Sequence, residues 1–166
     1  MCPGIGAKDL EHAGNSFVEI DLATVEDRRD VWILDYWANL PRAGALPSPK
    51  HIDPLDIPPD VLPYIFKVSV EWTDGRPGFV YRLSGTQLTK EYDREITGMT
   101  PRAAFPNHFE ELEAGYAIAA GRQRPTIHRY HLPVLNREYK WVQRLMCPLA
   151  SDGETVDMLF GCLTFP

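Results

Sequence analysis

The stretch YRLSGTQLTKEYDREITG, residues 81–98, carries the local pattern that decides the fold. Its first residues alternate apolar and polar side chains, with Tyr81 and Leu83 on one face, which is typical of a strand. Ser84, followed three residues later by Gln87, has the spacing of a helix capping box. Gly98 suits a left-handed helix end. The stretch predicts a strand, a corner and a helix, and it contains no nucleophile, metal cluster or phosphate loop.

The residues on either side extend this pattern into an antiparallel sheet. Residues 64–72 and 79–85 alternate around a turn at residues 73–78, so they predict a hairpin. Two more short helices are expected after residue 98, the second of them ending at Gly121. Three further strands are predicted over residues 125–132, 139–149 and 157–165. Five antiparallel strands covered on one face by short helices make an α+β architecture.

The first part of the chain is predicted to hold one helix and a long connection. Residues 1–25 are weakly periodic, so we expect a loosely ordered arm ahead of a single domain over residues 26–166. Residues 26–40 predict an aromatic N-terminal helix with an apolar stripe at helical spacing. Residues 41–63 carry seven prolines and are expected to form an irregular connection. The sheet and its helices then occupy residues 64–165.

Three segments together resemble the PAS superfamily, and in wording a bacterial PAS subfamily of small, single-domain proteins without an assigned activity. They are ALPSPKHIDPLDIPPDVLPYIFKVSV (45–70), YRLSGTQLTKEYDREITG (81–98), and the run from the LPV of the third strand to MCPLASDGETVDMLFG (146–161). The resemblance covers about residues 30–165. It implies the sheet order 2-1-5-4-3, counting the five expected strands along the chain, with the short helices over the concave face. It also implies sensing or protein–protein signalling, although one fold hosts many functions.

Charge and cysteine content argue against several classes of protein. Lys and Arg number 17 and Asp and Glu number 23, which gives a net charge of −6. This balance argues against a nucleic-acid partner and against docking on an anionic membrane. The three cysteines make no disulfide framework or zinc motif. No long apolar run predicts a membrane span and the first residues lack a secretory pattern, so we expect a cytoplasmic protein.

The covered face of the sheet is the candidate ligand site. Ligand pockets are mostly apolar with a few aimed polar groups, and here tyrosine hydroxyls would supply those groups, with the amide of Gln143 if it faces inward. We expect a small organic ligand, bound by Phe66, Tyr81, Leu83, Phe109, Leu112, Tyr116, Tyr130, Trp141 and Leu145. The same residues would suit a filled core, so a pure protein-interaction domain is the alternative.

The helix over residues 26–40 is the candidate partner surface. Trp32, Tyr36 and Trp37 give it more aromatic area than one side of a small domain usually needs, although all three could instead cap the sheet. We expect no output domain after Pro166, and so expect a signal to leave by association, through a homodimer or a signalling partner. We interpret Arg82 as structural, with the proline-rich segment or a carboxylate such as Asp53 or Asp56 as its partner.

Other chemistries have weaker support in the sequence. No histidine set has metal spacing, and the cofactor stays unknown. Cys147 and Cys162 are interpreted as buried thiols, with a redox pair as the alternative. A cone-shaped α+β hydrolase or isomerase would need a shifted acid or base inside the sheet, and His128 with Asp35 or Glu91 is the best candidate for one. We therefore expect no catalysis, and keep this small enzyme as an alternative.

Overall fold

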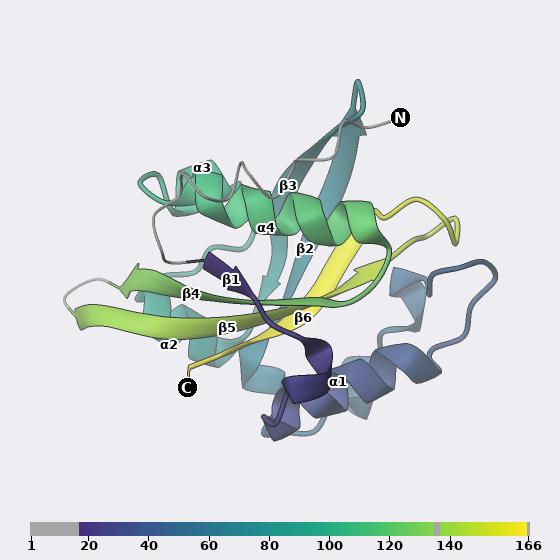
Figure 1. Cartoon of the computed structure of the whole chain (residues 1–166), viewed down its shortest axis with the longest axis horizontal. Helices are drawn as coiled ribbons and strands as arrows, with labels where there is room; N and C mark the ends of the chain where they lie inside the picture. Colours follow the sequence, from purple (N-terminus) through teal and green to yellow (C-terminus); the bar gives the residue numbers. More distant parts are fainter. Residues whose placement is uncertain (1–16, 135–136, 166) are drawn as a thin grey trace.

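The computed structural model describes residues 17–134 and 137–165. They form one antiparallel sheet in the order β1-β4-β5-β6-β2-β3 (Figure 1). Its strands are β1 (Phe17–Glu19), β2 (Ile65–Thr73), β3 (Arg76–Ser84), β4 (Thr126–Val134), β5 (Arg137–Leu149) and β6 (Met158–Thr164). The five expected strands are present in the expected order, and the α+β class is confirmed. β1 adds a sixth strand beside β4, at residues that the sequence analysis placed in a loose arm.

Helices lie on both faces of the sheet (Figure 1). The inner face is covered by α2 (Thr86–Tyr92), α3 (Pro101–Ala104) and α4 (Phe109–Arg122). The outer face is covered by α1 (Arg28–Asn39), which contacts β5 and β6, and by the proline-rich segment. The sheet therefore separates two hydrophobic cores, one on each face. No helix of the described chain is long and apolar enough to cross a membrane.

The outer layer is built from capped helical turns. The carboxylate of Asp27 accepts a hydrogen bond from the Arg29 backbone N–H at 2.9 Å and so caps the start of α1, which ends before Pro41. The proline-rich segment then runs through three short 3₁₀ turns, Pro49–His51, Pro54–Asp56 and Leu62–Tyr64. Prolines suit the first positions of such turns because their missing N–H needs no partner there.

The hairpin of β2 and β3 is tighter than the sequence indicated. Its turn is only Asp74-Gly75, with φ values of 52° and 74°, as a two-residue turn between twisted strands requires. Near the other end β3 has one extra residue: Lys67 pairs with Leu83, whereas the next residue, Val68, pairs with Tyr81. This bulge reverses the alternation of β3 between those two partners.

The corner between β3 and α2 differs from the predicted capping box. The N-cap of α2 is Gly85, and no side chain caps the helix. A Cβ at Gly85 would lie 2.2 Å from the carbonyl oxygen of Pro63, so glycine is needed there for space. α2 also ends earlier than predicted, at Tyr92, where Asp93 takes the left-handed conformation with φ 54°. Gly98 has φ +88° but lies beyond the helix.

Candidate functional site

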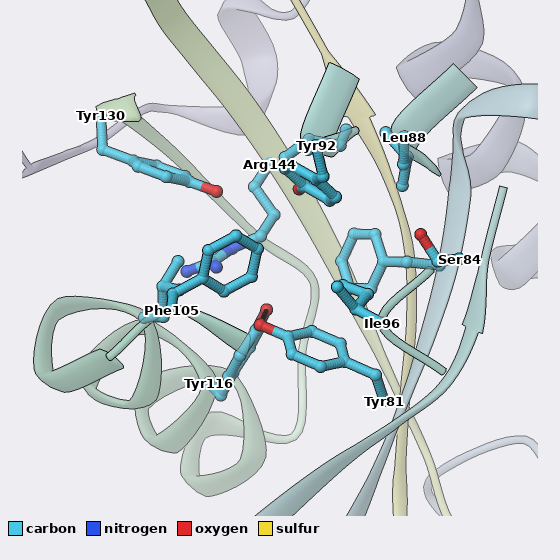
Figure 2. A pocket seen from close by; sticks show the side chains of 12 residues that line it. Tyr81, Ser84, Leu88, Tyr92, Ile96, Phe105, Tyr116, Tyr130 and Arg144 are labelled. Carbon is cyan, nitrogen blue, oxygen red and sulfur yellow. Dashed lines mark hydrogen bonds between the residues drawn. The ribbon is translucent and has the colours of Figure 1, made fainter. Parts of the chain in front are cut away.

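A largely enclosed cavity lies between the inner face of the sheet and its helices. Its volume is about 20 Å³, which is room for about one water molecule. Four tyrosines from four elements line it: Tyr81 of β3, Tyr92 of α2, Tyr116 of α4 and Tyr130 of β4. Figure 2 shows the side chain of Arg144, from β5, reaching into the space between them.

Arg144 is the only charged residue among those that line the cavity in the described chain. It is 2% exposed. Its guanidinium carbon lies 4.3 Å from the ring centroid of Tyr116 and 4.9 Å from that of Tyr130, so both rings make cation–π contacts. Within the described residues, none of its three side-chain nitrogens makes a hydrogen bond of normal length and angle. The hydroxyl of Tyr130 is the nearest candidate acceptor, because burial raises the pKa of Tyr130 while an interaction with Arg144 acts to lower it. A buried charge without a hydrogen-bonded partner destabilises the folded state. The site would therefore gain stability from a group that accepts hydrogen bonds from Arg144.

The position of Arg144 follows from the register of β5. Arg144 pairs with His128 of β4, and Val142 pairs with Tyr130, so these side chains share the inner face. β5 lies between β4 and β6 and is covered on both faces. A side chain that points inward from the middle of β5 therefore has no route to solvent.

Hydroxyl groups supply the other polar atoms of the cavity. The hydroxyl oxygens of Tyr81 and Tyr116 are 3.0 Å apart and share a hydrogen bond in which either can donate. The Ser84 hydroxyl is buried and has no partner among the described residues. Burial raises the pKa of Tyr130 to about 12, although the charge of Arg144 acts to lower it. Burial also raises the pKa of Tyr81, so these phenols keep their protons at neutral pH.

The charge of Arg144 also acts on its neighbours. Burial opposes the guanidinium charge and the surrounding tyrosines favour it, and the net shift of the Arg144 pKa is upward. Burial, followed by the charges of Arg144 and Arg122, lowers the pKa of His128 to about 3. His128 is therefore neutral at pH 7, and Arg144 carries the positive charge of this face.

Five of the nine residues predicted to bind a ligand line the cavity: Phe66, Tyr81, Leu112, Tyr116 and Tyr130. The other four lie elsewhere. Leu83 packs in the outer core because the bulge in β3 reverses its orientation and turns Ser84 inward instead. Phe109, at the start of α4, lies under the guanidinium of Arg102 at 4.4 Å.

Trp141 and Leu145 face outward, opposite to the predicted alternation of β5, because Val142 and Arg144 take the inward positions of this strand. Leu145 is fully buried in the outer core. Trp141 is 42% exposed and its ring centroid lies 3.6 Å from that of His131. Gln143 also faces outward, so its amide does not reach the cavity. Arg144 lies between Gln143 and Leu145 in the chain, so it points inward, where apolar side chains were expected.

The aromatic residues of α1 pack on the domain itself. Trp32 and Tyr36 stack with centroids 4.8 Å apart, and Tyr36 meets the ring of Phe160 edge-on. The indole nitrogen of Trp37 donates to the carbonyl oxygen of Pro148 at 2.8 Å. All three side chains keep partial exposure, so the partner surface predicted there stays a prediction.

Asp30 of α1 forms a second buried polar group, on the outer face. Its Oδ2 accepts a hydrogen bond from Nε2 of Gln143 at 2.9 Å. Burial raises the pKa of Asp30 to about 6. Cys147 and Cys162 are buried free thiols in the same core. Burial raises the pKa of both, which makes them poor nucleophiles.

Other residues singled out in the sequence lie away from the cavity. Arg82 donates from Nε to the hydroxyl of Ser69 at 3.0 Å, and not to Asp53 or Asp56. Asp35 is exposed on α1, across the sheet from His128, so these two do not form an acid–base pair. No group of three or more histidine, cysteine or acidic side chains in the described chain is placed to hold a metal ion.

Comparison with known proteins identifies the fold family. Residues 26–164 match the model of a family described as PAS domain. The search of curated proteins and the search of solved structures gave no significant match.

Proposed function

Because the chain belongs to the PAS domain family, we propose that it is a sensory or regulatory module that binds a small molecule in the cavity and catalyses no reaction. The observation that carries this proposal is the position of the cavity. A bound molecule there would touch β3, β4, β5, α2 and α4 at once. Such a molecule can favour one packing of the helices against the sheet over another, which is how a ligand shifts a two-state balance.

Binding of a larger ligand requires the inner layer to move. The closed cavity has room for about one water molecule, so a ligand of several heavy atoms must displace part of its lining. α2 has seven residues and one buried side chain, Leu88, whereas α4 has five buried residues. We therefore expect α2 to move before α4, because it loses less buried contact.

The proposed output is α1, on the opposite face. Gln143 follows the strand alternation to the outer face and holds Asp30 of α1, while its neighbour Arg144 points into the cavity. A movement of β5 at Arg144 would thus also move the adjacent Gln143, which is hydrogen-bonded to α1. The stacked rings of Trp32 and Tyr36 lie on the same helix, and we propose this surface for a homodimer or a signalling partner.

Hydrogen exchange tests this function. A library of small acids, alcohols and aromatic compounds is screened by thermal shift, and each hit is followed by amide exchange of the full chain. We expect slower exchange in α2 and altered exchange in α1 when the cavity is filled. Hits that change neither helix would contradict a sensory role, and a screen without hits, together with purified protein that holds no molecule in the cavity, would contradict ligand binding.

A protein-interaction domain with a filled core is the second candidate. The observation that favours it is the small volume of the cavity, about 20 Å³. In that case partner binding on α1 would leave exchange in α2 unchanged. The small enzyme has less support, because Asp35, one of the two acidic residues considered for it, lies on α1 across the sheet from His128. The cytoplasmic location stays a prediction.

A further inference from the structure

We infer that the cavity binds a small monovalent anion, which accepts hydrogen bonds from the guanidinium of Arg144. The anion is either a free ion of the size of chloride or formate, or the carboxylate end of a larger molecule. For its role as a signal this inference rests on the proposed function. Its chemistry rests on the side chains that line the cavity.

The first argument is the charge of Arg144. The side chain is 2% exposed, and its Nε, Nη1 and Nη2 atoms make no hydrogen bond of normal length and angle among the described residues. The neutral hydroxyl of Tyr130 is the nearest candidate acceptor and does not balance the charge. No acidic residue lines the cavity within that part of the chain. The rings of Tyr116 and Tyr130 attract the cation but do not accept its N–H groups as a carboxylate would. An anion is the partner that would both neutralise the charge and accept the hydrogen bonds.

The second argument is that the remaining polar groups are neutral hydroxyls that can donate to a guest. The Ser84 hydroxyl has no partner in the described chain. Of the hydroxyls of Tyr81 and Tyr116, one donates to the other, which leaves the second proton for another acceptor. The raised pKa of Tyr81 and that of Tyr130 keep these phenols protonated. Hydroxyl groups that can donate, placed around one cation, favour an anionic guest over a cationic one.

The third argument is size. The cavity volume of about 20 Å³ fits one water-sized guest. A halide or formate is the class of anion closest to this size, and formate can also pair with guanidinium through two parallel hydrogen bonds. A longer carboxylate would place its charged end on Arg144 and its remainder toward Leu88 of α2, which then has to move.

The experiment is a thermal-shift titration of the full chain in a buffer whose only inorganic anion is sulfate. Sodium chloride, sodium formate, sodium acetate and sodium benzoate are added separately, at ionic strength held constant with sodium sulfate. We expect a saturable rise of the unfolding midpoint with at least one of the four, because a ligand that binds only the folded state stabilises it. A rise of the midpoint with chloride or formate indicates a free ion. A larger rise with acetate or benzoate indicates the carboxylate of a larger molecule.

Arg144→Met tests the residue. It should weaken the anion response about 10- to 100-fold, the usual effect of losing hydrogen bonds to a charged group. Its midpoint in sulfate should equal or exceed that of the wild type, because an unpaired cation is removed. Arg82→Met, a change of an exposed arginine on β3, should leave the response intact. Ser84→Ala, which removes one donor, gives a second test if Arg144→Met does not fold.

The outcomes separate this inference from the proposed function. Equal responses to all salts, or a response that Arg144→Met and Ser84→Ala both retain, would overturn the anion site. Crystals grown with sodium bromide add a direct measurement, since the inference predicts an anomalous peak beside Arg144. If neutral compounds protect α2 while no anion binds, the function stands and the inference fails. If an anion binds without any change of exchange in α2 or α1, the site stands and the sensory function fails.

Discussion

Replacing Asp30 with asparagine should change how stability depends on pH. Asp30 is fully buried, and its Oδ2 accepts from Gln143 at 2.9 Å, while its Oδ1 makes no hydrogen bond of normal geometry among the described residues. Burial raises the pKa of Asp30 to about 6, and the hydrogen bond from Gln143 offsets only part of this effect. The charge of Asp27 acts in the same direction as burial, whereas an interaction with the Cys162 thiol acts to lower the pKa of Asp30.

The sign and size follow from these values. The folded protein keeps a proton on Asp30 up to about pH 6, whereas an unfolded chain releases it near pH 3.9. Between these values the folded state binds more protons, so the free energy of unfolding falls as pH rises. About two pKa units at 1.36 kcal/mol each make about 3 kcal/mol in all, of which about 2 kcal/mol falls between pH 4.5 and 7.5.

Urea unfolding followed by tryptophan fluorescence measures this term at pH 4.5, 6 and 7.5. Asp30→Asn has no proton to lose, so its free energy of unfolding should gain about 2 kcal/mol on the wild type over this range. Asp35→Asn, on the exposed side of α1, is the matched control and should differ from the wild type by a constant. A constant difference for Asp30→Asn as well would refute the raised pKa.

Three further changes test the packing of the sheet. Burial lowers the pKa of His128 to about 3, whereas an unfolded chain titrates near 6.5. As pH falls from about 6.5 to 3, the free energy of unfolding of the wild type should therefore decrease by about 1.4 kcal/mol per pH unit relative to His128→Asn. Urea unfolding at pH 6.5 and 5 checks this. Gly161→Ala should destabilise the fold by about 3 kcal/mol in thermal or urea unfolding, because its Cβ would lie 1.8 Å from the carbonyl oxygen of Leu145. Trp37→Phe removes the 2.8 Å hydrogen bond to Pro148 and should cost about 1–2 kcal/mol in urea unfolding.

Each of these changes has a control or a contradicting result. A His128→Asn difference that does not vary with pH would place the pKa of His128 near its ordinary value. Gly121→Ala, in α4, meets open space and should be neutral or stabilising; an equal loss in both glycine variants would mean that the contact at Leu145 is not the cause. Unchanged stability of Trp37→Phe would mean that water replaces the lost donor.

The sequence predicted the strands well and their orientation poorly. The alternation of β2 and β3 is readable because these strands are polar on one side over much of their length. The extra residue of β3 is not readable, because a bulge depends on pairing with β2 and leaves no local signal. Because of this extra residue, Ser84 and not Leu83 lines the cavity.

The prediction of which side chains of β5 face inward was wrong for a different reason. Residues 142–149 of this strand are all buried, so both faces of it read as apolar and alternation does not tell them apart. Charged side chains usually point to solvent, so the residue pattern offered no reason to expect Arg144 at the cavity. The order of the five strands was predicted from the family resemblance, and periodicity alone did not give it.

Among the described residues, Asp30 and Arg144 are the two buried side chains of acidic residues, lysine or arginine, and they lie on opposite faces of the same part of the sheet. Arg144 lies in the inner core, where its charge has no ionic partner among the described residues, and Asp30 is hydrogen-bonded to Gln143 in the outer core. Arg144 and Gln143 are adjacent residues of β5. Neither charge neutralises the other, because the strand stands between them. Each is a cost to stability that a filled apolar core would avoid. Local rules commonly fail where a protein binds or switches, and no acidic side chain of the described residues lines the cavity around the inner charge. We therefore expect a ligand to stabilise this fold most where it removes the cost of the Arg144 charge.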